Sequence, residues 1–188
     1  MCFPIAEQHK GLRIASGILL ILAAVTSFLP TSIFVSMRFR FDLQDFFVEL
    51  LIAAPLLIAG VLILCRHLRI AGIVIGVFAL FEIGSLIYTS ITSSAPVGLE
   101  MFISTFLTQG GGILIALALL LPHRRSAWMC ILGALLRFIA SVYSVAVYLP
   151  GNLSFLFVAM TLVLIALFKA GELAGWILLG VWFPSQKR

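Results

Sequence analysis

The stretch AWMCILGALLRFIASVYSVAVYL, residues 127–149, carries an arginine, Arg137, near the middle of an otherwise apolar run. A charge at the centre of a bilayer span costs at least about 2.5–3.5 kcal/mol unless it meets a partner or water. On a helix, one face of this run is small or polar, and the opposite face is bulky and apolar. Small faces favour close helix contact, so we expect a helical bundle that accommodates Arg137. The small or polar face holds Cys130, Gly133, Ala134, Arg137, Ser141 and Ser144.

The composition of the whole chain agrees with a membrane bundle. Of the 188 residues, 63% are hydrophobic and 10% are charged, whereas soluble domains contain roughly 25% charged residues. Several apolar runs reach the length of about 20 residues that a bilayer span needs. We therefore predict an all-α, polytopic membrane helix bundle that forms a single domain over residues 1–188.

Six transmembrane helices are predicted. The segment Gln-Gly-Gly-Gly at residues 109–112 is expected to interrupt the fourth, and Pro55 to kink the second. Leu-Arg-Ile-Ala occurs at residues 12–15 and again at 68–71, which favours three helical hairpins of similar length. Regular span length with basic ends would produce the same pattern. The predicted spans are 11–30, 45–65, 70–92, 101–121, 127–149 and 153–183.

The basic residues predict the orientation. With six spans both termini share one side, and eight basic residues then lie there against two, Arg38 and Arg40, on the other. The positive-inside rule places the N- and C-termini in the cytoplasm, and we expect a bacterial cell membrane. The net charge of +5 is explained by this bias, so no nucleic-acid partner is expected.

The last apolar run has two readings. Its 31 residues would make a helix of roughly 46 Å, which exceeds the hydrocarbon core of about 30 Å. Either one tilted helix protrudes inward, or the helix breaks near Lys169 and its end lies along the interface through Trp176 and Trp182. We favour the tilted helix, with Lys169 and Glu172 forming an ion pair near the inner headgroups.

Three polar residues are expected in one layer near the midplane. At 1.5 Å per residue, Arg137 lies roughly 16 Å and Glu82 roughly 19 Å from the basic side, with Gln109 at a similar level. We predict that Glu82 pairs with Arg137 and that Gln109 joins them. The layer is either a structural pair that sets helix register or a binding site for a small polar solute.

The sequence offers no enzyme signature. It lacks HExxH, GxSxG, a P-loop and paired intramembrane aspartates, so we expect no catalytic residues. Cys2, Cys65 and Cys130 are widely spaced and odd in number, which predicts free thiols. We expect neither a cofactor nor a metal.

The layout resembles two families. GILLILAAVTSFLP at residues 17–30, the two Leu-Arg-Ile-Ala segments, Pro96 and Pro150 resemble the HdeD-type six-helix inner-membrane proteins of bacteria. That resemblance implies three hairpins and a stress-associated role, and it carries over no functional residue. The chain is also similar in size and helix number to the substrate-binding subunit of energy-coupling-factor vitamin importers.

Two functions are therefore considered. The first is a non-enzymatic six-span membrane protein that acts through helix packing and partners, with the pair of Glu82 and Arg137 structural. The second is a small-solute binding or transport component with Glu82, Gln109 and Arg137 around its site. Under either function, the expected partners are the lipid bilayer and either a second copy of the chain or another membrane subunit.

Overall fold

The computed structural model describes residues 5–38, 43–92, 98–121, 126–148 and 155–185. These ranges form six α-helices and contain no strand, which confirms the all-α prediction. Each helix coincides with one of the apolar runs. The helices are α1 (Ile5–Arg38), α2 (Leu43–Leu64), α3 (Leu68–Thr92), α4 (Leu99–Leu120), α5 (Ser126–Tyr148) and α6 (Phe155–Ser185).

Two helices are more continuous than the sequence suggested, and α6 follows the favoured prediction of one helix. Helix α1 runs past Pro30 to Arg38, where a connection was expected. Helix α4 passes through the three glycines 110–112 without interruption, because packing against neighbouring helices outweighs the intrinsic cost of glycine. Helix α6 is a single helix of 31 residues, so the alternative of a break near Lys169 is wrong.

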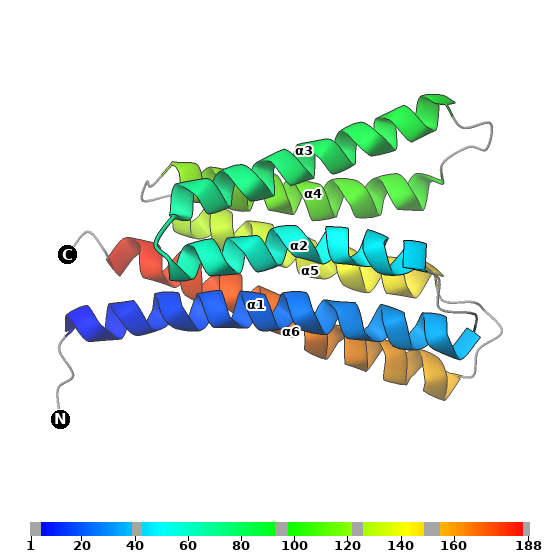
Figure 1. Cartoon of the computed structure of the whole chain (residues 1–188), viewed down its shortest axis with the longest axis horizontal. Helices are drawn as coiled ribbons and strands as arrows, with labels where there is room; N and C mark the ends of the chain where they lie inside the picture. Colours follow the sequence, from blue (N-terminus) through cyan, green and yellow to red (C-terminus); the bar gives the residue numbers. More distant parts are fainter. Residues whose placement is uncertain (1–4, 39–42, 93–97, 122–125, 149–154, 186–188) are drawn as a thin grey trace.

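The helices form a closed ring. Each packs against its neighbour in the chain, and α6 packs against α1, while no described pair makes contact across the ring. Figure 1 shows all six running along the long axis, with the start of α1 and the end of α6 at the same end of the bundle. Side chains on the inner helix faces are therefore brought towards one another.

Glycines set the closest helix crossings. A methyl group placed on Gly111 of α4 would lie 2.5 Å from the carbonyl oxygen of Gly133 of α5, and the reverse distance is also 2.5 Å. A methyl group on Gly17 of α1 would lie 3.1 Å from the carbonyl oxygen of Gly60 of α2. These backbones approach as the small faces predicted. Gly111 and Gly133 thus form the close crossing between α4 and α5.

Helix α2 ends in a Schellman motif at the turn that leads to α3. The N–H of His67 donates to the carbonyl of Leu62 at 2.8 Å, and that of Arg66 to the carbonyl of Ile63 at 3.2 Å. Arg66 occupies the left-handed position that glycine usually fills, with φ of 66°. Arg13 of α1 is buried, and its Nη1 donates to the carbonyls of Ile63 and Leu64, both at 2.7 Å. A cation thus satisfies the carboxyl end of α2.

Replacing Arg66 by glycine is expected to stabilise the protein by about 1 kcal/mol, because glycine removes the steric cost of the left-handed conformation. The measurement is the thermal unfolding midpoint of the purified protein in detergent. Arg66→Ala is the control, because it removes the same charge and retains the strained backbone. Equal midpoints for the glycine and alanine variants would contradict this explanation.

Three of the helices meet the length and apolar composition of a membrane span. They are residues Leu68–Thr92, Leu99–Leu120 and Ser126–Ser144, as judged over the described part of the chain.

Candidate functional site

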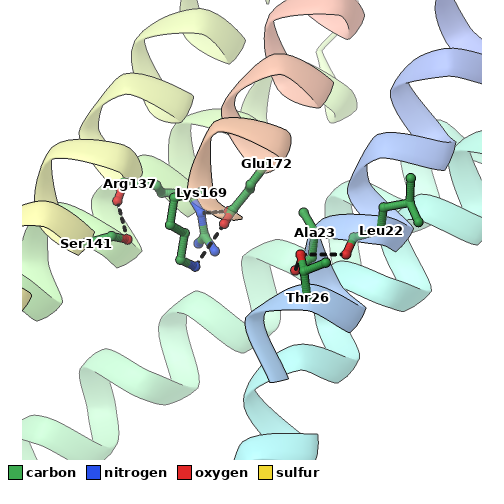
Figure 2. A network of polar contacts seen from close by, with 7 residues as sticks. All are labelled: Leu22, Ala23, Thr26, Arg137, Ser141, Lys169 and Glu172. Carbon is green, nitrogen blue, oxygen red and sulfur yellow. Dashed lines mark hydrogen bonds and ion pairs between the residues drawn. The ribbon is translucent and has the colours of Figure 1, made fainter. Parts of the chain in front are cut away.

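A cluster of three charged side chains joins α5 to α6 in the middle of the bundle. The Nε of Arg137 donates to Oε1 of Glu172 at 2.7 Å, and the Nζ of Lys169 donates to Oε2 of the same carboxylate at 3.1 Å. Both contacts are ion pairs. Figure 2 shows the two cations reaching Glu172 from α5 and α6. We call Arg137, Lys169 and Glu172 the charged triad.

The charged triad carries one more positive than negative charge. The Glu172 side chain is 5% exposed, whereas those of Arg137 and Lys169 are 22% and 28% exposed. The carboxylate is therefore covered by the protein, and the accessible part of the cluster is cationic. An excess charge inside a helix bundle is stabilised by a further anion or by water.

The expected pair between Glu82 and Arg137 is not formed, because Arg137 pairs with Glu172. The physical reason is the order of helices in the ring. Helix α4 separates α3 from α5, so the small-residue faces of α3 and α5 each meet α4 rather than one another. Helix α6, in contrast, packs directly on α5 and brings its carboxylate to Arg137.

Gln109 and Arg137 nevertheless lie close to one another, around Gly112 of α4. A methyl group on Gly112 would lie 3.4 Å from Nη1 of Arg137 and 3.8 Å from Oε1 of Gln109. The same position is 3.4 Å from Cβ of Ala79 on α3. The bare backbone of Gly112 thus leaves room for the guanidinium on the inner side of α4.

Glu82 lies one turn after Ala79, at about the same level, and is half-buried. Ala79 and Leu86, which share its face of α3, are both buried, whereas Phe81 on the opposite face is exposed. Within the described residues, no ion pair or hydrogen bond reaches the Glu82 carboxylate. The structure thus places Glu82 in the polar layer without a direct partner.

Lys169 and Glu172 lie deeper than expected. The sequence analysis placed them near the inner headgroups, but Glu172 contacts Arg137, the twelfth residue of a helix that begins at Ser126. Counting back from the end of α6 at Ser185 puts Glu172 roughly 20 Å along the helix, close to the depth of Arg137. The sequence alone would have predicted this depth of Glu172 if α6 had been taken as one helix that ends at the surface.

Polar contacts that the sequence analysis missed surround the triad on α6. Ser16 of α1 donates to the carbonyl of Gly175 at 2.8 Å, and the buried Cys130 of α5 donates to that of Trp176 at 3.3 Å. Both donors are fully buried. Thr26 of α1, in contrast, donates within its own helix, to the carbonyls of Leu22 and Ala23 (Figure 2).

Trp176 and Trp182 are buried in the core, so neither serves as an interfacial anchor. The indole Nε1 of Trp176 is the one buried side-chain nitrogen or oxygen that lacks a hydrogen-bond partner among the described residues. Unpaired buried donors are uncommon and call for an explanation. Trp176 follows Glu172 by one turn on the same face of α6.

The described residues contain no group of three histidine, cysteine or acidic side chains that would hold a metal ion. Cys65 and Cys130 are free thiols, and Cys2 lies outside the described residues. No protein-family model matches the chain, and searches of curated proteins and of solved structures gave no significant match. The function of the chain is therefore inferred from the charged triad and the residues around it.

Proposed function

We propose that this chain is a non-enzymatic integral membrane protein whose six helices cross a bacterial cell membrane. The outward faces support this proposal. On α3, Val77, Leu80 and Phe81 are between 62% and 64% exposed, and Leu135 and Ile139 are exposed on α5. Soluble proteins rarely expose contiguous apolar patches of this kind, whereas a bilayer covers them. The basic turns argue for cytoplasmic termini.

We further propose that the protein binds a small polar solute at the charged triad, as a binding or transport component. The observation that carries this proposal is the exposure pattern of the triad: the two cations are partly accessible, while their shared carboxylate is covered. A charged cluster whose only role was to fix the register of two helices would be more stable if it were fully buried and neutral. Gln109 and Glu82 add polar groups at the same level.

A structural role is the second candidate, and the short contact between Arg137 and Glu172 favours it. In that case the triad fixes the register of α5 against α6, and the protein acts through helix packing and partners, as the HdeD-type resemblance implies. The two candidates differ in one property, the access of water to the triad.

Cysteine labelling measures that access. Single cysteines at Gln109 and Ser141, in a background without Cys2, Cys65 and Cys130, are expected to react with a membrane-impermeant thiol reagent from one side of the membrane. Ser141 lies one turn from Arg137 and donates to its carbonyl at 2.8 Å. Ser85 provides the control, because it lies at a similar depth on an exposed part of α3, where lipid would surround it.

Labelling at Ser141 and Gln109 without labelling at Ser85 would support a water-filled route to the triad. Absence of labelling at all three positions, from both sides, would favour the structural role. Equal labelling at Ser85 would mean that α3 is not surrounded by lipid, and the membrane assignment would then be wrong.

A further inference from the structure

We propose that the solute bound at the charged triad is a small monovalent anion, which is held by the guanidinium of Arg137 and the ammonium of Lys169. The inference rests on the proposed function and adds the chemical class of the ligand. It follows from the charge balance, the accessible atoms and an unpaired donor on the same helix face.

The charges of the triad indicate that the ligand carries a single negative charge. Arg137 and Lys169 contribute two positive charges, and Glu172 contributes one negative charge through both of its oxygens. One additional negative charge makes the cluster neutral. In a low-dielectric interior this neutrality is strongly favoured, whereas a cation would raise the excess to two.

Both cations retain hydrogen-bond donors that Glu172 does not use. Glu172 accepts from Nε of Arg137, which leaves the two η nitrogens of the guanidinium for a ligand. Nη1 lies on the inner side of α4, beside the bare backbone of Gly112. Lys169 uses one of its three donors on Glu172. Two cationic groups with unused donors match the oxygen atoms of an anion.

A third donor lies close by. The buried Nε1 of Trp176 has no acceptor among the described residues. Helical side chains lean towards the N-terminus of their helix, so the indole leans towards the turn that holds Glu172. A buried N–H without a protein acceptor, one turn from the residue that binds both cations, is the complement of an anionic group. Trp176 also provides a fluorescent reporter of binding.

Glu82 acts as the internal competitor of the ligand. It is half-buried at about the level of Gln109 and has no ion pair within the described ranges. Its negative charge opposes the entry of an anion into the layer. Removing that charge in Glu82→Gln is therefore expected to tighten anion binding by roughly threefold or more, whereas a cation would bind the same variant more weakly.

The test uses the purified full-length chain in detergent. Sodium acetate or sodium chloride replaces sodium gluconate at constant ionic strength, and acetamide serves as the uncharged analogue of acetate. The readouts are the thermal unfolding midpoint, which rises when a ligand binds the folded state, and the intrinsic fluorescence in a Trp128→Phe background. We expect acetate or chloride to raise the midpoint and change the fluorescence, and acetamide to do neither.

Variants assign the effect to the triad. Lys169→Gln leaves a neutral pair of Arg137 and Glu172, so the protein is expected to fold and to bind the anion at least about tenfold more weakly. Lys10→Gln is the matched control on an exposed lysine and retains the response. An equal response to acetamide, a full response in Lys169→Gln, or weaker binding in Glu82→Gln would overturn the proposal.

The cysteine-labelling experiment distinguishes a failure of the anion proposal from a failure of the proposed solute-binding function. Labelled cysteines at Gln109 and Ser141, together with no response to any anion, would overturn the anion class and leave a solute-binding function in place. Neither labelling nor an anion response would overturn both.

Discussion

Replacing Glu172 by glutamine is expected to destabilise the protein by about 3–5 kcal/mol, the largest effect of any single change in the charged triad. The variant leaves Arg137 and Lys169 inside the bundle without their shared carboxylate, and an uncompensated buried charge carries this cost. The measurement is the free energy of unfolding in mixed detergent micelles, with the thermal midpoint as a second readout.

The companion variants of the triad make the prediction specific. Arg137→Gln is expected to cost less than Glu172→Gln, because Lys169 and Glu172 remain as a neutral pair. Adding Arg137→Gln to Glu172→Gln is expected to recover part of the loss, since one unpaired charge remains instead of two. Equal losses in both single variants, or no recovery in the double variant, would contradict the charge balance drawn from the structure.

The second large effect is expected at the crossing of α4 and α5. Gly111→Ala is expected to destabilise the protein by about 2–3 kcal/mol, because the added methyl group would lie 2.5 Å from a backbone carbonyl of α5 and the helices must move apart. Such a shift would also displace Arg137, whose Cγ would be 2.8 Å from that methyl group. The thermal midpoint and the binding response to acetate are measured together.

The adjacent glycine supplies the matched control. A methyl group on Gly110 would have no atom within 4 Å, so Gly110→Ala is expected to be neutral or to stabilise α4 by up to about 1 kcal/mol through helix propensity. The two variants differ by one position in the same run of three glycines. Similar midpoints for both would show that the close crossing does not hold in solution.

Much of the fold was predictable from the sequence. Long apolar runs separated by short polar or proline-containing segments predicted six helices, and their order along the chain predicted hairpins that pack side by side. The small face around Arg137 predicted close packing of α5. Helix ends were less accurate, as at Arg38 of α1, because the polarity of a segment does not show where a helix stops.

The sequence predicted which residues form the candidate site, but it did not predict which of them pair with one another. Arg137, Gln109, Glu82, Lys169 and Glu172 were all named as candidates, since ionisable residues in apolar runs are rare and costly. The partner of Arg137 was assigned to Glu82 because depth along a helix was the one coordinate that the sequence provides. Depth does not state which helices are neighbours.

Trp176 shows a further limit of sequence reasoning. Tryptophan near a chain end suggests an interfacial anchor, but this side chain is buried in the core with its indole N–H unpaired. Its burial follows from the position of α6 between α1 and α5. Ser16 and Cys130, which donate to carbonyls of α6, were likewise visible only once these three helices were in place.

The sequence by itself therefore determined the helical class, the number of helices and the level at which the charged residues lie. These properties depend on local apolar length and on the fixed rise of a helix, both of which a single chain segment encodes. The tertiary structure decided that α4 separates α3 from α5, that α6 closes the ring, and that Glu172 reaches Arg137. Those outcomes depend on which faces pack together, and packing is a property of pairs of helices rather than of any one segment.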